Sequence, residues 1–111
     1  MIHFMKLKTM YLNLVRDGVK TIELRLFDEK RRLIKVGDII EFSDVCNDGN
    51  IIKTEVKKIY KARDFTDLCS IIQYNKAGFS SNDALIKTLE EFYPLIKQQQ
   101  YGVVGIEIKL I

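Results

Sequence analysis

The stretch GVKTIELRLFDEKRRLIKVGDIIEF, residues 18–42, decides which fold the sequence predicts. Its first part alternates between apolar and polar residues, with Ile22, Leu24 and Leu26 in one set and Thr21, Glu23 and Arg25 in the other. A period of two residues is typical of a β-strand, because successive side chains point to opposite faces of a sheet. The stretch therefore predicts a strand over residues 20–26 whose apolar face packs in the core.

The polar face of this strand has two interpretations. Glu23 and Arg25 can form a weak ion pair on a solvent-exposed face, which would stabilise the fold by about 0–1 kcal/mol. Alternatively, they lie in a polar cleft, where Lys20 and Arg25 bind an anion and Glu23 accepts hydrogen bonds from the amino or imino group of a base. The alternation alone favours the exposed face.

A run of mixed charge, residues 28–32, follows the strand. Such runs are usually solvated loops or the first turns of helices. The functional alternative is a basic rim that meets a phosphate backbone, formed by Lys30, Arg31, Arg32 and Lys35. In that case Asp28 and Glu29 orient the arginines.

Outside this stretch, periodicity and turn residues predict further strands and helices. Strands are expected over residues 2–7, from the Gly37-Asp38 turn to residue 42, over residues 51–62 with a bulge at Lys57-Lys58, and over residues 101–111. Helices are expected with N-caps at Thr9, at Asp64, and at Ser80 or Ser81, and the first of them is expected to end at Gly18. Residues 46–50 (CNDGN) are expected to form a turn and residues 97–100 (KQQQ) a polar connector.

This order of elements is strand, helix, three strands, two helices and a final strand. Short alternating strands, mostly joined as hairpins, predict an α+β protein in which a mixed sheet curls into a small barrel. The helices are expected to pack at the ends or side of that barrel. A doubly wound parallel sheet is excluded, because strands and helices do not alternate regularly in the middle of the chain.

Composition is that of an ordinary globular domain. The chain has 111 residues, 47% hydrophobic and 30% charged, which predicts one compact domain over residues 1–111. A net charge of +3 permits a nucleic-acid or nucleotide partner without requiring one. The sequence has neither a signal-peptide pattern nor an apolar stretch long enough to span a membrane, so a cytoplasmic protein without membrane contact is expected.

Metal-binding spacing is also absent. Cys46 and Cys69 are far apart, and His3 is the only histidine. We therefore expect neither a metal site nor a cofactor, and interpret both cysteines as free thiols in a reducing compartment.

The sequence resembles the small ASCH-domain proteins of the PUA-like superfamily. The resemblance is carried by the Gly-x-Lys-Thr-x-Glu-x-Arg pattern and the following Lys-x-Gly-Asp strand of residues 18–42, by the closing QYGVVGIEI of residues 100–108, and by the helical segment before the first pattern. It implies a PUA-like mixed β-barrel of about five to six strands with flanking helices. It also implies a positively charged cleft beside the first helix and second strand, which takes RNA or a nucleotide.

Carried over residue by residue, the resemblance implies a binding site formed by Lys20, Thr21, Glu23 and Arg25, with Lys6, Arg31 and Tyr101 as wall residues. Tyr101 is expected to begin the last strand, where its ring can stack on a base with about 1–3 kcal/mol. An aromatic residue that packs on a helix at the barrel mouth is the alternative for Tyr101.

Some relatives are amidohydrolases that deacylate N4-acetylcytidine with a lysine, a threonine and a glutamate. Lys20 matches their lysine, but Glu23 stands at the threonine position, and residues 76–83 offer no clear match for the glutamate. RNA or nucleotide binding is therefore the leading prediction. In the amidohydrolase alternative, Glu23 is a general base on water and Lys20 or Arg25 stabilises an oxyanion. A protein partner in the cleft is a third possibility.

Overall fold

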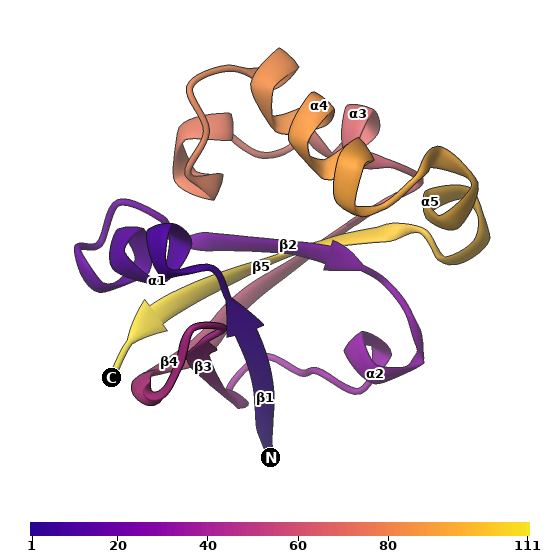
Figure 1. The fold of residues 1–111 in the computed structure, drawn as a ribbon. Helices are drawn as coiled ribbons and strands as arrows, with labels where there is room; N and C mark the ends of the chain where they lie inside the picture. Colours follow the sequence, from indigo (N-terminus) through magenta and orange to yellow (C-terminus); the bar gives the residue numbers. More distant parts are fainter.

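A five-stranded mixed sheet curls into a half-barrel in the computed structural model, which describes residues 1–111 (Figure 1). Its strands are β1 (Ile2–Leu7), β2 (Ile22–Leu26), β3 (Ile39–Asp44), β4 (Asn47–Ala62) and β5 (Val103–Leu110). They lie in the order β1-β3-β4-β5-β2. The β1–β3 pair is parallel and the other pairs are antiparallel. The predicted α+β class with a curled mixed sheet and flanking helices is therefore confirmed, and the sheet forms a half-barrel.

The helices lie mainly on one side of this sheet. They are α1 (Thr9–Arg16), α2 (Glu29–Arg32), α3 (Phe65–Leu68), the 3₁₀ helix η1 (Tyr74–Ala77), α4 (Asn82–Phe92) and α5 (Leu95–Tyr101). Figure 1 shows α3, α4 and α5 gathered above β2 and β5, whereas α2 lies below β2 in the same view. No helix is long and apolar enough to cross a membrane.

Both faces of the sheet bury apolar side chains. One cluster of twelve residues fills the curl of the half-barrel, with Ile40, Phe42 and Val56 completely buried. A second cluster of nine residues lies between β2, β5 and the helices, and includes Ile22 and Leu24. The predicted inward face of β2 is thereby confirmed, and its other face points toward the curl and β1.

Local signals in the sequence end and begin several elements as predicted. Asp64 and Ser81 act as N-caps, because their side chains accept hydrogen bonds from the backbone N–H groups of Asp67 and Ala84. Gly18, with φ at +76°, follows α1 in a conformation that other residues rarely adopt. The predicted bulge is present between Val56 and Lys58, and it bends the long β4.

Two local predictions were wrong: the turn over residues 46–50 and the N-cap at Thr9. The turn is formed by Val45 and Cys46, and β4 already begins at Asn47, because the Cys46 N–H donates to the Asp44 carboxylate at 2.8 Å. Thr9 does not cap α1; its hydroxyl donates to the same carboxylate at 2.7 Å. Both differences arise because the carboxylate of the buried Asp44 accepts hydrogen bonds from the Cys46 N–H and the Thr9 hydroxyl.

The KQQQ segment is helical rather than a connector. It lies within α5, and Tyr101 ends that helix instead of beginning the last strand. Gln98 is only 1% exposed. Its Oε1 accepts a hydrogen bond from the Phe65 backbone N–H at 3.0 Å, and its Nε2 donates to the Tyr93 carbonyl at 2.8 Å. A buried amide that satisfies two backbone groups thus fixes α5 against α3 and α4.

Replacement of this glutamine should be costly. Gln98→Leu would leave the Phe65 N–H and the Tyr93 carbonyl buried without partners, at about 1–3 kcal/mol for each. We expect urea denaturation to show a free energy of unfolding lower by about 2–4 kcal/mol. Gln99→Leu, at the exposed neighbouring position, is the matched control, with an expected change within about 0.5 kcal/mol. Equal losses in the two variants would contradict the role of Gln98.

Candidate functional site

A seam separates β1 from β2 in the half-barrel. These strands are the two ends of the sheet order, so each has one edge without a strand partner. The curl brings the edges close, and Arg25 Nη2 on β2 donates a hydrogen bond to the Lys6 carbonyl on β1 at 2.7 Å. One arginine therefore bridges two strands that do not pair through their backbones.

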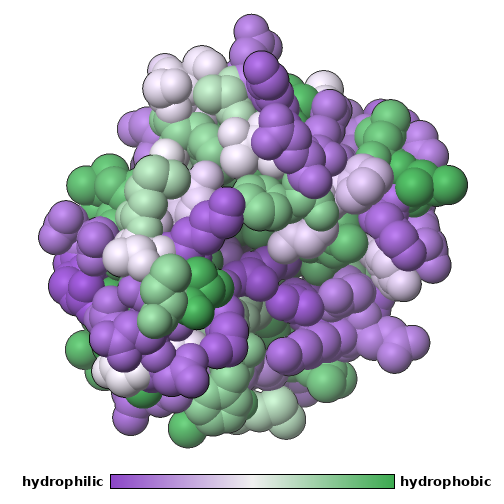
Figure 2. Space-filling model, in the orientation of Figure 1, coloured by the Kyte–Doolittle hydropathy of each residue, from purple (hydrophilic) through white to green (hydrophobic).

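A cleft of about 260 Å³ lies along this seam, between β1, α1, β2 and the end of α4. Its charged lining residues are Lys6, Lys8, Lys20, Glu23 and Arg25, and its aromatic ones are Tyr11, Phe79, Phe92 and Tyr93. Figure 2 shows hydrophilic and hydrophobic residues meeting around the hollow at the centre of this face. The cleft thus combines an apolar wall with a concentration of charge.

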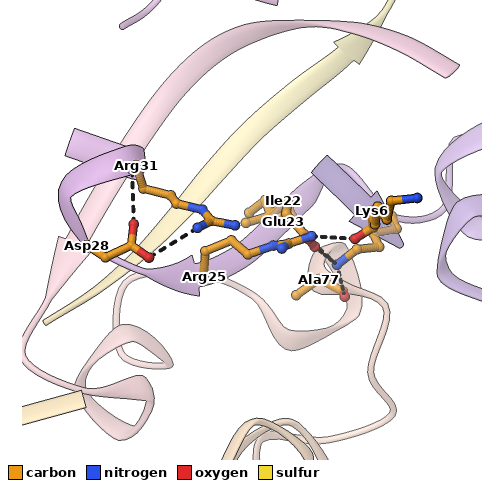
Figure 3. Close-up of polar contacts among 8 residues, drawn as sticks. Lys6, Ile22, Glu23, Arg25, Asp28, Arg31 and Ala77 are labelled. Atoms are coloured by element: carbon orange, nitrogen blue, oxygen red, sulfur yellow. Dashed lines mark hydrogen bonds and ion pairs between the residues drawn. The ribbon is translucent and has the colours of Figure 1, made fainter. Parts of the chain in front are cut away.

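Three charged side chains, Lys20, Glu23 and Arg25, form one connected group in this cleft. Figure 3 labels Glu23 and Arg25. Glu23 lies between two cations: its Oε1 is 3.2 Å from Lys20 Nζ, and its Oε2 accepts a hydrogen bond from Arg25 Nε at 2.7 Å. Glu23 is 4% exposed and Lys20 is 3% exposed. The interpretation of this face as solvent-exposed, with a weak surface ion pair, is therefore wrong.

The position of Lys20 follows from where β2 begins. Regular pairing of β2 starts at Ile22, so the strict alternation of side chains does not apply to Lys20. Its Nζ donates to the carbonyls of Ile22 and Ala77, each at 2.8 Å. These two bonds, one of them to the segment that precedes α4, hold the ammonium group beside Glu23.

Burial and mutual charge set the protonation of this group. Burial lowers the pKa of Lys20, and the nearby Glu23 only partly offsets that effect. Burial alone would raise the pKa of Glu23, but the charges of Lys20 and Arg25 outweigh it, so the pKa of Glu23 is lowered. Burial also disfavours the charged form of Arg25. The negative charge of the neighbouring Glu23 favours that form, and the pKa of Arg25 is raised. Two cations thus enclose one carboxylate, which leaves an excess of positive charge.

Hydrogen-bonding capacity remains on the cleft floor. Each Glu23 oxygen has one cation as its protein partner, and a carboxylate oxygen can accept more than one hydrogen bond. Arg25 donates through Nε and Nη2, and its Nη1 has no partner in the protein. Donors and acceptors are therefore available side by side to a planar polar ligand.

Aromatic residues from separate segments form the walls. The Tyr11 and Phe79 ring centroids are 6.0 Å apart, and Phe92 and Tyr93 are 6.4 Å apart. Burial raises the pKa of the Tyr11 hydroxyl, and the charge of Glu23 raises it further, which places Tyr11 close to the charged group. Phe92 is 48% exposed and its ring has Lys8 Nζ 4.7 Å away.

These aromatic residues were missed in the sequence. Tyr11 stands four residues before Val15 and Phe92 three residues after Leu89, spacings that predict an apolar helical face in the core. The available signal was that an aromatic pair, Phe92-Tyr93, ends the helix directly before Pro94. Nothing local shows that this end reaches the seam.

The seven residues predicted for the site divide into two groups. Lys6, Lys20, Glu23 and Arg25 line the cleft. The Lys6 ammonium lies at its mouth with a 60% exposed side chain, paired with Asp48 at 2.9 Å.

Thr21, Arg31 and Tyr101 do not line the cleft. The Thr21 backbone pairs with Lys76 and Ile108. Arg31 forms an ion pair with Asp28 at 3.1 Å, and Figure 3 shows its side chain directed toward Arg25. Asp28 also caps α2, as its side chain accepts a hydrogen bond from the Arg31 N–H, so residues 28–32 start a helix. Tyr101 lies in a different groove, beside Phe27.

The remaining titratable residues do not gather into a metal centre: no three His, Cys, Asp or Glu side chains are close enough to hold an ion. His3 forms a hydrogen bond with Asp38 at 2.8 Å. That contact and the Lys35 backbone N–H lower the pKa of Asp38 to about 2. Cys46 and Cys69 are both free thiols.

The lowered pKa of Glu23 predicts an acid-sensitive fold. A carboxyl whose pKa is lower in the folded state stabilises the fold at pH values above its unfolded pKa of about 4.3. That stabilisation is lost as the pH falls through the pKa of the folded state. We expect the free energy of unfolding to fall more steeply toward acid pH in the natural protein than in the Lys20→Met/Glu23→Gln double variant. Asp38 acts in the same direction but is present in both proteins. Urea denaturation at a series of pH values measures the free energy of unfolding of both proteins. The same dependence on pH in the two proteins would contradict the prediction.

Comparisons with known proteins agree with this architecture. The family model for the ASCH domain matches residues 5–111. The crystal structure of hypothetical protein PH0355 is similar with a TM-score of 0.89 and 37% sequence identity, covering 100% of both chains. The solution structure of protein PF0455 from Pyrococcus furiosus has a TM-score of 0.79 and 35% identity, covering 100% of this chain and 98% of the other.

A more distant structure shares the fold. ASCH from Zymomonas mobilis has a TM-score of 0.69 at 14% identity, covering 97% of this chain and 66% of that one. A search of curated proteins gave no match. The family match along residues 5–111 and the two full-length relatives above 30% identity decide the assignment: the chain belongs to the ASCH-domain family, which is generally linked to RNA binding.

Proposed function

We propose that this ASCH-domain protein binds RNA or a nucleotide by taking a base into the cleft at the β1–β2 seam. The observation that carries the proposal is the buried group of Lys20, Glu23 and Arg25, whose free donors and acceptors face a cavity with aromatic walls. The proposal includes what the sequence predicts about context: a single domain over residues 1–111 that acts in the cytoplasm.

The dimensions and chemistry of the cleft support a base-sized ligand. Its volume of about 260 Å³ is near the lower end of small-molecule sites, which are roughly 300–1,000 Å³. That space suits a single base and not a double helix. Arg25 can donate hydrogen bonds and Glu23 can accept them. A base edge that presents both an acceptor and a donor therefore matches this pair. Rings such as Tyr11 and Phe79 offer stacking surfaces that tolerate any base.

Positive charge at the mouth supports a phosphate-bearing ligand. Lys6 and Lys8 line the entrance, and Lys8 has no acidic partner. Arg31, held by Asp28, is directed toward the same region. Cations that neutralise phosphates release counterions, so their contribution to affinity depends on salt.

Fluorescence anisotropy with labelled single-stranded RNAs of about ten nucleotides tests the proposal. If two or three phosphates are neutralised, we expect the logarithm of the affinity to fall with the logarithm of salt concentration with a slope of about −1.4 to −2. Unlabelled nucleoside monophosphates should compete. Failure of every RNA and every nucleotide to bind, or binding that salt does not change, would contradict the proposal. Absence of all binding would favour the protein partner.

An amidohydrolase acting on a modified nucleoside such as N4-acetylcytidine is the second candidate. One observation favours it: Lys20, whose pKa is lowered by burial, contacts a carboxylate inside a cavity. The lowered pKa of Glu23 argues against a role as general base, which works best with a pKa near the working pH. An absorbance assay on N4-acetylcytidine decides: turnover that Lys20→Ala and Glu23→Ala both abolish would establish the enzyme.

A further inference from the structure

We infer that the ligand of the cleft is a single RNA strand that continues into a second groove, where Arg32 and Lys61 bind a neighbouring phosphate. The inference rests on the proposed function and extends it, because it assigns an extended strand rather than a free nucleotide as the ligand.

The second groove lies where β2 and β4 end and β5 begins, beside α5. It is an open depression of about 750 Å³ with both polar and apolar lining residues, among them Phe27, Lys61, Arg63 and Tyr101. Phe27 follows β2 directly, and its N–H continues the pairing of β2 with β5 by donating to the Gly102 carbonyl at 2.9 Å. The groove therefore stands on rigid elements of the sheet.

Two cations lie near one aromatic ring at this groove. Lys61 lines the groove, whereas Arg32 lies beside it and contacts two of its lining residues, Phe27 and Tyr101. The Arg32 guanidinium lies 4.4 Å and the Lys61 ammonium 5.0 Å from the centroid of Phe27. Arg32 Nη2 also donates to the Tyr101 carbonyl at 3.3 Å. Neither cation forms an ion pair within the protein. Like charges near one ring repel each other, and a phosphate bound at this groove would reduce that repulsion.

Two acidic side chains lie near this groove, and one of them, Asp64, is among the residues that line it. Asp67 pairs with Arg63 at 2.6 Å, and the Asp64 carboxylate accepts the hydrogen bond that caps α3. They do not neutralise Arg32 or Lys61. The charge at the groove therefore favours an anion from outside the protein.

The cleft and the groove lie at neighbouring positions of one segment, since Arg25 lines the cleft and Phe27 lines the groove. Arg25 and Phe27 are two residues apart in an extended segment, so their side chains point to the same side, about 6.6 Å apart along the strand. Phe27 packs against the cluster inside the curl, the side toward which Arg25 also points. Asp28 acts on both Arg25 and Arg31. The distance along this segment from the cleft to the groove therefore suits successive nucleotides of one strand.

Tyr101 gains a role on this path. Its half-buried ring lines the groove, where it can stack on the base that follows the one in the cleft. Stacking and phosphate contact at the same groove are the usual pair of interactions in proteins that hold single strands.

The test compares labelled single-stranded RNAs of about ten nucleotides with nucleoside monophosphates on the same variants. Arg32→Ala and Lys61→Ala should each weaken RNA binding about 3–10-fold and reduce the salt slope by about 0.7, while leaving nucleotide affinity unchanged. The matched control is Lys109→Ala, at an exposed position at the far end of β5, with an expected change below about twofold. Phe27→Leu, which keeps an apolar side chain without the ring, should weaken RNA binding alone.

The outcomes separate this inference from the proposed function. If Lys61→Ala behaves like Lys109→Ala, or weakens nucleotide and RNA binding equally, the second groove is wrong and the cleft proposal stands. If the natural protein binds nucleotides but no RNA more tightly, the inference is likewise overturned. If it binds neither RNA nor nucleotides, both are overturned. Thermal unfolding of each variant identifies any loss of binding that comes from loss of structure.

Discussion

Glu23→Gln is expected to lower the free energy of unfolding by about 3–5 kcal/mol, a large part of the stability of a domain of this size. The amide retains the volume of the carboxylate but not its charge. It would leave Lys20 and Arg25 buried beside each other, without the anion that lies 3.2 Å from one and 2.7 Å from the other. It also turns an N–H donor toward groups that can only donate. Urea denaturation of the two proteins measures the difference.

A double-mutant cycle isolates the ion pair from other losses. Lys20→Met removes one cation and its bonds to the Ile22 and Ala77 carbonyls, so its own cost includes more than the pair. In the Lys20→Met/Glu23→Gln protein the uncompensated ammonium is gone, and we expect the total loss to be smaller than the sum of the single losses by about 1–3 kcal/mol. Additive losses would show that Glu23 does not depend on Lys20.

Arg25→Lys should weaken RNA or nucleotide binding by about 30–150-fold, which corresponds to about 2–3 kcal/mol. The substitution keeps the positive charge that Glu23 requires. A lysine cannot, however, make the contact to Glu23, bridge to the Lys6 carbonyl and still offer a free donor to a ligand, as the three nitrogens of Arg25 do. Anisotropy titration with the same RNAs measures the loss, and denaturation shows whether the fold is retained.

Arg32→Lys is the matched control for that prediction. Arg32 lies at the open groove and contacts one carbonyl, so retention of charge should preserve most of its contribution, with a change below about threefold. Equal effects of the two substitutions would mean that the cleft contributes only general positive charge, and would contradict a specific role for Arg25.

The alternation of β2 predicts the strand and its core face correctly, yet does not decide the environment of Glu23. The period of two residues shows only that Glu23 and Arg25 lie on the other face of the strand from Ile22 and Leu24. Whether that opposite face is exposed depends on the curl of the sheet, which brings β1 to β2 across residues distant in sequence. The pattern left a polar cleft as one of two interpretations, and only the resemblance to ASCH proteins favoured it.

Residues 97–101 show the other kind of limit. Three consecutive glutamines are typical of a polar connector, because the sequence does not show which side chain faces inward. Gln98 is buried because the Phe65 N–H and the Tyr93 carbonyl need partners, and both come from other elements. The resulting helix moves Tyr101 from the expected strand to the second groove. Tertiary hydrogen bonding, which no local pattern contains, decides both outcomes.

The central claim is that the β1–β2 seam holds the base of a bound nucleotide. Perturbation of backbone amide NMR signals by nucleoside monophosphates tests it most directly. We predict that the largest changes occur at residues 20–25, 77–79 and 92–93, which line or support the cleft, and that RNA extends them to Phe27 and Tyr101. Changes concentrated instead around Glu41 and Lys53, which pair on the outer part of β3 and β4, would contradict the claim.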